Sequence, residues 1–410
     1  MNPPIQNTMK TIIIPDPALR EYGGHHPAIV EALVNSQAYK TNRIKLEVYA
    51  NKACDSAFIE RLESERVSIT PYFETDFYQY FYQSPTLSQA QPYVRQLTKE
   101  YSTLLGGINQ RATKEKIILW FHTLTWLHAQ ALTCALKLLK IEPHAFTIVI
   151  GLMYKPHKKN EPYFQMYNEL SFKALATFAN INFFASDFET AESFREILAR
   201  EIFIQPCALI NDADSAIELE VSSEKQLLLY CGDAKHNKGF CQLPSVIQAI
   251  IKGGNSELKL VIQYTLTNEN SELINTTNEL VNLAAQYNIE IINRFLSHGE
   301  LLTLFSNSDA LLLNYDQSAY QEQSSGVLWL AAYYQLAVIS LTTTWCEREA
   351  NRLSCRYTNL KIDHLTTKKI AQITWSNRIG CASIGRVNND YFNQLFQDVG
   401  NWLTNMDVEQ

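Results

Sequence analysis

The sequence lacks several features that define common protein classes. Its eight cysteines are scattered, with no CxxC pair and no spacing typical of metal ligands, so we expect reduced thiols, mostly in the core, and no metal site. No apolar stretch approaches the roughly 18 residues that a membrane-spanning helix needs. The N-terminal "MNPPIQNTMKTIIIPDP" lacks the apolar run of a signal peptide. A cytoplasmic location is therefore expected.

Charge is also sparse. Only 19% of the residues are charged, the net charge is -7 and the isoelectric point is about 5.8. This balance argues against bulk binding to nucleic acid or to an anionic membrane surface, although it is compatible with a local basic patch. A phosphate group would therefore have to be held by a few nearby cations. The sequence also lacks short-period repeats and low-complexity segments.

What the chain does contain is enough apolar material for two cores. Its 410 residues, 46% of them hydrophobic, exceed what one core usually covers. Two domains separated by a cleft are the natural expectation. The first half alternates short apolar segments with helical stretches, which is typical of a parallel sheet covered on both faces. Strands are predicted within residues 10–17, 43–51, 66–73, 115–123, 144–153 and 181–187.

The second half repeats the alternation after a polar, acidic segment. Strands are predicted within residues 225–233, 258–266, 289–295, 310–316 and 336–341. The predicted fold is therefore α/β, with two Rossmann-like doubly wound domains facing across a cleft. The predicted divisions are an N-terminal domain 1–206, a linker 207–224, a C-terminal domain 225–385 and a terminal helix 386–410 that packs back on the first domain.

Doubly wound sheets bind ligands at the carboxyl ends of their strands, so the segments after each strand are the candidate sites. "YCGDAKHNKGF" (230–240) places Lys235 and Lys238 directly before a helix start. Two ammonium groups beside free helical N–H groups suit a diphosphate. A solvated basic turn is the alternative interpretation.

Two segments of the first half could present histidines to a ligand. In "PDPALREYGGHHP" (15–27), Gly23 and Gly24 would allow close approach of a ligand, and His25 and His26 follow them. His122 comes at the end of a predicted strand. A simple turn, capping or surface histidines, and a structural role for His122 remain the competing explanations.

The segment "YQEQSSGVLWLAAYYQLAVIS" (320–340) joins a small-residue turn to an apolar helix. No charged side chain occurs from Ser324 to Ser340. Backbone N–H groups at a helix start can nevertheless bind a phosphate without a side-chain charge. Any partner cations would have to come from elsewhere in the chain.

Three segments, taken in order, resemble a known family. "YCGDAKHNKGF", "FLSHGELLTLFSNSDALLLNYD" and "YQEQSSGVLWLAAYYQLAVIS" resemble the donor domain of GT-B glycosyltransferases, in the large retaining group of glycosyltransferase family 4. "PDPALREYGGHHPAIVEAL" and "FHTLTW" resemble the acceptor domain of its bacterial members. The resemblance covers nearly the whole chain and is worth more than any single motif.

The resemblance implies an activity. It implies sugar transfer from a nucleotide-diphosphate sugar to a glycan or lipid-linked acceptor, with retention, in polysaccharide or glycoconjugate biosynthesis. No metal and no other cofactor is expected, and no nucleic acid partner, whereas peripheral membrane association would be compatible.

The resemblance also assigns roles to residues. It places the donor diphosphate on Gly232, Lys235, Lys238, Ser325 and Gly326. Further donor-site candidates are Leu296, Ser297, Tyr320, Glu322 and Val327. His122 is the catalytic candidate, and Gly23, Gly24, His25 and His26 would lie on the acceptor side.

The chain departs from the family pattern at three positions. Lys235 stands where arginine is usual and loses the bidentate fork, and Asn314 stands where related bacterial sequences commonly have proline. Leu330 occupies the position of a glutamate that contacts the donor ribose. Losing that charge-assisted bond would weaken donor binding by about 10- to 100-fold.

Two other functions follow from these departures and from the fold. The first is a catalytically inactive GT-B homologue that acts as a scaffold or partner in a glycan-assembly complex. The second, a GT-B nucleotide-sugar epimerase, would need carboxylates poised for proton transfer, and the matching loops contain no such set.

Overall fold

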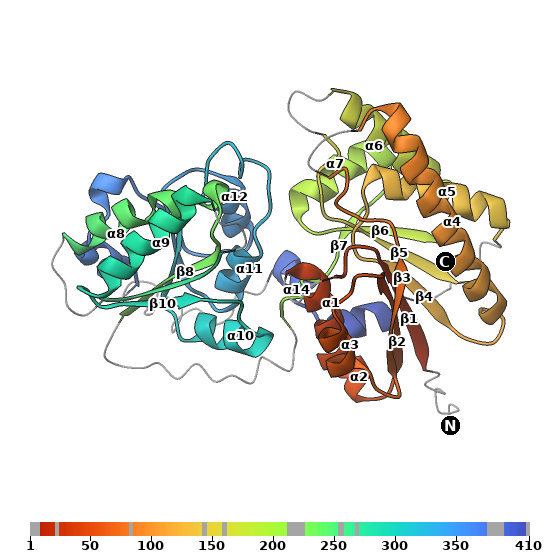
Figure 1. Ribbon diagram of the computed structural model, residues 1–410, viewed down its shortest axis with the longest axis horizontal. Coiled ribbons are helices and arrows are strands. Elements are labelled where there is room, and N and C mark those ends of the chain that lie inside the picture. The colour runs from red at the N-terminus through yellow and green to blue at the C-terminus, as the bar shows by residue number, and fades with distance from the viewer. Residues whose placement is uncertain are drawn as a thin grey trace. The chain divides into compact units, whose positions relative to one another are not determined.

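The computed structural model of the chain describes residues 9–20, 24–81, 85–141, 146–157, 162–210, 226–252, 258–266, 270–374 and 389–406. The chain divides into two compact units, residues 1–213 with 394–410 and residues 214–393. Each unit is built on one parallel sheet, as Figure 1 shows, so the predicted α/β class is confirmed. Most of the predicted linker, 207–224, lies outside the described residues.

The first unit contains a seven-stranded sheet in the order β3-β2-β1-β4-β5-β6-β7. Every paired strand runs parallel to its neighbour. Each predicted strand range of the first half contains one of these strands. Their bounds are β1 (Lys10–Asp16), β2 (Ile44–Asn51), β3 (Val67–Phe73), β4 (Ile117–Phe121), β5 (Thr147–Leu152), β6 (Ile181–Ala185) and β7 (Phe203–Ile204).

Helices lie on both sides of this sheet, with α1 to α3 on one side and α4 and α5 on the other (Figure 1). Several begin at a residue whose side chain accepts a backbone N–H, such as Asp55 before α3 and Asp187 before α7. The bounds are α1 (His25–Asn35), α2 (Gln37–Lys40), α3 (Ser56–Leu62), α4 (Leu87–Arg111), α5 (Trp126–Leu139), α6 (Pro162–Leu175), α7 (Phe188–Leu198) and α15 (Val399–Thr404).

The last helix, α15, belongs to the core of the first unit. Val399, Trp402 and Leu403 are buried among residues of β1, β2 and α1. The ring of Trp402 meets Trp120 edge-on, with centroids 5.8 Å apart. Asp398 accepts the backbone N–H of Gln37 at 3.0 Å and so ties α15 to α2. Helix α15 therefore completes the core that β1, β2 and α1 begin.

The second unit contains a six-stranded sheet in the order β10-β9-β8-β11-β12-β13. Each predicted strand range of the second half again contains one strand, whereas β13 was not predicted. The strands are β8 (Gln226–Asp233), β9 (Leu258–Thr265), β10 (Ile289–Asn293), β11 (Ala310–Leu313), β12 (Ala337–Ser340) and β13 (Tyr357–Asn359).

Helices and short 3-10 turns surround the second sheet. The first turn of α10 is fixed by a capping box between Ser297 and Glu300, and Asn270 caps α9. The bounds are η2 (His236–Lys238), η3 (Phe240–Gln242), α8 (Leu243–Ile251), α9 (Ser271–Ala284), α10 (His298–Ser306), α11 (Gly326–Tyr333), α12 (Trp345–Arg352), η4 (Ile362–His364) and α14 (Asp390–Leu395), with further helix at 367–374.

In both sheets the order in which the chain adds strands reverses once, at the corresponding place. From β1 the chain adds β2 and β3 on one side, and then β4 to β7 on the other. From β8 it likewise adds β9 and β10, and then β11 to β13. Crevices open at such switch points, beyond the carboxyl ends of the strands. The candidate sites are therefore beyond β1 and β4 in the first unit and beyond β8 and β11 in the second.

No helix in the described part of the chain is long and apolar enough to cross a membrane.

Candidate functional site

A buried carboxylate lies at the switch point of the first unit. Asp16 is the last residue of β1, His122 directly follows β4, and His26 is the second residue of α1. One carboxylate oxygen, Oδ2, lies 2.9 Å from Nδ1 of His26 and 2.9 Å from Nε2 of His122. The other, Oδ1, accepts the backbone N–H of Ala18 at 3.0 Å. The structure thus brings together two predicted histidines and one aspartate that was not predicted.

The protonation of this cluster follows from its contacts. Burial alone would raise the pKa of Asp16, but the two histidines outweigh it and hold that pKa well below its usual range. An ionised carboxylate only accepts, so both rings donate to it. Burial also lowers the pKa of His122, although Asp16 opposes this shift. His122 is therefore a neutral imidazole with its proton on Nε2.

The other ring nitrogen of His122 is a buried acceptor that the described residues leave unused. Nδ1 is buried and has no hydrogen-bond partner among the described residues. With the proton on Nε2, this atom carries a lone pair and can accept a hydrogen bond or a proton from a hydroxyl group. Buried polar atoms are normally satisfied, so an unpartnered one at a switch point indicates a binding role.

The neighbouring histidines belong to the start of α1. His26 extends the cluster through Nε2, which lies 2.8 Å from the hydroxyl of Tyr78. The ring of His25 lies 4.0 Å from that of His26, and burial lowers the pKa of His25 well below its usual range. Gly24 precedes the helix and has a φ of 78°. This positive φ favours glycine over residues with a side chain. Gly23 lies outside the described residues.

Two residues that were not predicted hold this site in shape. Asn51, at the end of β2, donates through Nδ2 to the carbonyls of Pro17 and Thr75 at 3.1 Å each, and so joins the loops after β1 and β3. Gly151 on β5 lies against the backbone of His122: an added Cβ would be 2.1 Å from the His122 carbonyl oxygen. Only glycine allows this approach.

The switch point of the second unit carries the segment 230–240 with Lys235 and Lys238, which we call the basic loop. Nζ of Lys235 lies 2.9 Å from Oδ2 of Asp233, and Nζ of Lys238 lies 3.6 Å from the same oxygen. The side chain of Lys238 is 20% exposed and that of Lys235 is 51% exposed. Lys238 folds over Gly232, where an added Cβ would be 3.1 Å from its Nζ. Together the two lysines and Asp233 leave one net positive charge.

The basic loop is attached to the loop that follows β11. Gly239 has φ of 68°, and an added Cβ would lie 1.7 Å from the carbonyl oxygen of Asn314. Asn314 in turn donates through Nδ2 to the Gly239 carbonyl at 2.9 Å, and the N–H of Asp316 donates to the carbonyl of Asn237 at 2.9 Å. Asn314, one of the departures from the family pattern, therefore has a structural role beside the lysines.

The small-residue turn at the start of α11 connects to the same loop. The hydroxyls of Ser325 and Tyr315 lie 2.9 Å apart, and the ring of Tyr315 stacks on Tyr320 at 3.9 Å. Ser325 is thus held by Tyr315, and within the described chain its side chain caps no N–H of α11. The first N–H groups of Gly326 and Val327 have no helical acceptor and can bind an anion.

The remaining candidates take different positions. Leu330 is fully buried in α11 and presents nothing to a ligand. Glu322 is exposed before the turn, and Leu296 is half-buried. The hydroxyl of Ser297 is occupied by the capping box of α10, where it donates to Glu300 at 2.9 Å. Any contribution of Ser297 to a ligand would therefore come from its backbone.

Within the part of the chain that the structure describes, two groups of three residues could hold a metal ion: Asp16 with His26 and His122, and His236 with Cys241 and Glu272. In the first group both histidines already donate to the carboxylate. The seven described cysteines form no disulfide, as expected, but only Cys207, Cys231 and Cys346 are fully buried. Cys381 lies outside the described residues.

Comparison with known proteins supports the fold. No family model and no curated protein sequence matches this chain. Among solved structures, similar folds include a putative UDP-N-acetylglucosamine 2-epimerase from Listeria monocytogenes (TM-score 0.58, 15% identity, 97% of this chain and 95% of that one). A UDP-forming alpha,alpha-trehalose-phosphate synthase from Burkholderia xenovorans, in complex with glucose-6-phosphate, gives a TM-score of 0.57 at 11% identity, over 98% of this chain and all of that one.

A third similar structure is Anabaena Alr3699/HepE in complex with UDP and glucose, with a TM-score of 0.53 and 13% identity, over 97% of this chain and 100% of that one. Identities of this size show a shared fold and leave the reaction open. The predicted GT-B fold class is confirmed.

Proposed function

We propose that this protein is a glycosyltransferase that moves a sugar from a nucleotide-diphosphate sugar to a glycan or lipid-linked acceptor, with retention, in polysaccharide or glycoconjugate biosynthesis. The observation that carries the proposal is the lysine pair of the second unit. Lys235 and Lys238 lie at the switch point of a doubly wound sheet, on a loop whose glycines are required by its geometry. Two structures of the same fold support it, one named as a UDP-forming synthase and the other in complex with UDP and glucose.

The proposed role of the second unit is to stabilise the leaving diphosphate. Sugar transfer breaks the bond between the sugar and the phosphate and adds one negative charge to the leaving diphosphate, and preorganised cations and N–H groups stabilise such charge. Lys235 and Lys238 supply the cations, and the first turn of α11 supplies backbone donors beside Ser325 and Gly326. Because Asp233 competes for both lysines, the diphosphate would have to share them with this carboxylate.

The proposed role of the first unit is to bind the acceptor and the transferred sugar. Nδ1 of His122 would accept a hydrogen bond from a sugar hydroxyl, with the tautomer fixed by Asp16. Gly24, His25 and His26 would line the same side. In the retaining route proposed for this fold, the diphosphate itself assists deprotonation of the acceptor. That route requires no metal and no separate carboxylate base.

A screen of nucleotide sugars tests the proposal. UDP-, GDP- and ADP-linked sugars are incubated with the protein and a panel of glycan and lipid-linked acceptors, and release of free nucleoside diphosphate is measured. We expect release that depends on one donor and on an acceptor, and loss of that release in Lys238→Met. NMR of the product anomeric carbon then reports retention or inversion. Binding of a nucleotide sugar without turnover under any acceptor would contradict the transferase assignment.

A second candidate function is an inactive homologue that serves as a scaffold in a glycan-assembly complex. Its support is Leu330, which is fully buried where the family has a ribose-binding glutamate. Calorimetry with UDP, GDP and ADP separates the two, since the scaffold predicts no nucleotide binding. Asp16 does not favour an epimerase, because a carboxylate held well below its usual pKa is a weak base.

A further inference from the structure

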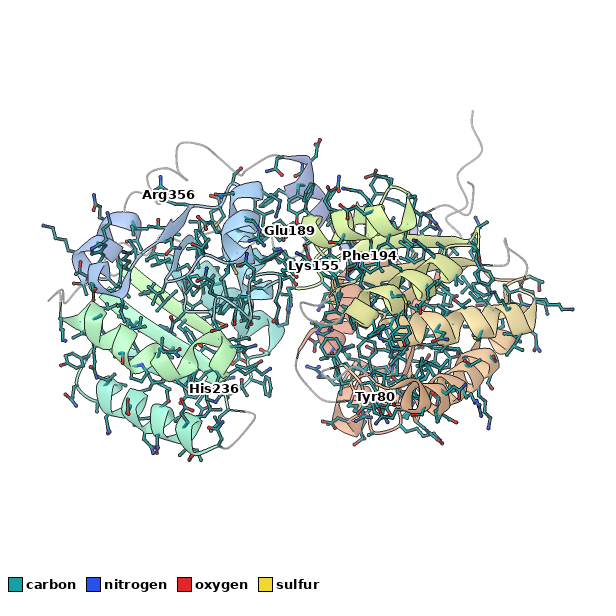
Figure 2. The ribbon with its side chains drawn as sticks, turned by 90° about the horizontal axis from the view of Figure 1, so that it is seen from above. Tyr80, Lys155, Glu189, Phe194, His236 and Arg356 are labelled. Atoms are coloured by element: carbon teal, nitrogen blue, oxygen red, sulfur yellow. The ribbon has the colours of Figure 1, made fainter. Side chains whose placement is uncertain are left out.

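A second constellation of metal-ligating side chains lies beside the basic loop of the second unit. His236 belongs to η2, Cys241 to η3 and Glu272 to the first turn of α9. Nδ1 of His236 lies 3.4 Å from Sγ of Cys241 and 3.8 Å from Oε2 of Glu272, and the three ligand atoms lie within 4.8 Å of one another. Figure 2 labels His236, whose side chain is half exposed to solvent.

These separations match those around a tetrahedral zinc ion. Zinc bonds of about 2.0 Å to nitrogen and oxygen and about 2.3 Å to sulfur place neighbouring ligand atoms roughly 3.3 to 3.5 Å apart. The observed distances from Nδ1 to sulfur and to oxygen are 3.4 and 3.8 Å, so rotation of exposed side chains is enough to receive the ion. Three protein ligands leave the fourth position to solvent.

We propose that His236, Cys241 and Glu272 bind a divalent cation of the zinc class and thereby fasten the loop 235–242 to the start of α9. His236 and Cys241 come from two consecutive 3-10 turns, and Glu272 comes from the first turn of α9, which is capped by Asn270. Binding replaces the thiol proton by a metal–sulfur bond and releases that proton to solvent. None of the three ligands has a role in the proposed sugar transfer, although the loop they fasten carries Lys235 and Lys238, and the metal site does not depend on that proposal.

Asn270 limits the affinity of this site. Its Oδ1 accepts the N–H of Leu273 at 2.8 Å, which directs Nδ2 toward Nε2 of His236 at 3.3 Å. In the metal-free protein the His236 proton therefore sits on Nδ1. A cation at Nδ1 moves that proton to Nε2, where it faces another donor. In tighter zinc sites a carboxylate or carbonyl accepts this N–H.

Asn270→Asp is therefore a gain-of-function test. Aspartate retains the oxygen that caps α9 and offers a second oxygen to Nε2–H of His236. We expect metal affinity to rise by about 10-fold or more, the effect typical of such supporting groups. A rise supports Nδ1 as the ligand atom, and an unchanged or weaker affinity would overturn that assignment.

Cobalt binding to the protein identifies the thiolate. One equivalent of Co²⁺ bound through Cys241 gives a thiolate-to-cobalt absorption band in the near ultraviolet, and Zn²⁺ displaces it. We expect Cys241→Ser to lose the band and Glu272→Gln to weaken binding by about 10-fold or more. Cys134→Ser, a half-buried cysteine on α5, is the matched control and should keep the band.

The same measurement excludes the other candidate cluster. Asp16, His26 and His122 include no thiol, so cobalt bound there gives no such band. Because Cys54 experiences the charge of Asp16, Cys54→Ser is included as well. Absence of the band in the wild-type protein, its survival in Cys241→Ser, or its loss in Cys54→Ser would each overturn the proposal. Slower amide hydrogen exchange over residues 235–242 on adding Zn²⁺ is the expected sign that the loop is fastened.

Discussion

Replacing Lys238 by methionine tests whether the basic loop binds a diphosphate. Methionine keeps much of the apolar stem and removes the ammonium group. A hydrogen bond to a charged group contributes about 1.5 to 3 kcal/mol, so UDP affinity should fall by about 10- to 150-fold. The loss should approach the upper value because Lys238 is only 20% exposed, and because Asp233 then cancels the remaining charge of Lys235. Lys235→Met, at a more exposed position, should lose less.

Isothermal titration calorimetry with UDP, GDP and ADP measures these affinities, at about 0.05 M and about 0.15 M salt because exposed charges are screened. Lys259→Met is the matched control: it lies near the amino end of β9, pairs with Glu290 at 2.5 Å, and should leave affinity unchanged. Asp233→Asn removes the competing carboxylate and should tighten binding several-fold. Wild-type affinity in Lys238→Met would refute the diphosphate site. A larger loss in Lys235→Met than in Lys238→Met would refute the argument that the less exposed lysine contributes more to UDP binding.

Four further outcomes are expected. His122→Gln should lower kcat by about 2- to 10-fold in steady-state assays with little change in nucleotide affinity, because it loses one neutral hydrogen bond from the acceptor or the transferred sugar. Burial lowers the pKa of His128 to about 3, so on acidification this histidine is protonated in the unfolded chain before it is protonated in the folded one. Denaturant titrations should therefore show that the free energy of unfolding falls by about 2 kcal/mol between pH 7 and pH 5. His128→Gln should flatten that pH dependence. Leu330→Glu buries an unpaired carboxylate and should cost at least about 2 kcal/mol in unfolding free energy, whereas Leu330→Met should cost less than about 1.5 kcal/mol. Gly151→Ala should destabilise the fold by about 1 to 3 kcal/mol and reduce turnover by displacing His122, while Gly106→Ala, which meets only one side chain at 3.9 Å on helix α4, should be neutral or stabilising.

The strands could be predicted from the sequence because a parallel sheet buried on both faces needs nearly continuous apolar residues. The two strands without a clear signal are short and lie at sheet edges. β13 (Tyr357–Asn359) is polar and β7 (Phe203–Ile204) has only two residues. Edge strands have one unpaired side and need less apolar sequence, so their pattern is weak.

The candidate sites were predictable only where their residues are neighbours in sequence. Lys235 and Lys238 lie on one short loop, and their place after a strand is a local signal. His122 could be found from its place after a strand, but its partner Asp16 is separated from it by 106 positions. Their contact depends on β1 lying next to β4, which apolar patterning does not specify. An aspartate closing the first strand, in "PDP", was the available signal.

The second group of metal-ligating residues also depends on a contact between segments that are far apart in sequence. His236 and Cys241 are close in sequence, but Glu272 reaches them only because α9 begins beside the basic loop. A search for regular cysteine and histidine spacing therefore predicts no metal site here. Leu330 shows the reverse case: the family pattern pointed to it as a site position, and the structure buries it in the core.

The return of α15 to the first unit has a consequence for biosynthesis. Residues 214–393 form a compact unit that is continuous in sequence, whereas the other unit is split between residues 1–213 and 394–410. On the ribosome the inserted unit can close while its host still lacks Val399, Trp402 and Leu403. Until these three residues leave the exit tunnel, the apolar surface of β1, β2 and α1 that they cover stays open to water. At this stage the partly built unit exposes apolar surface of the kind that chaperones bind.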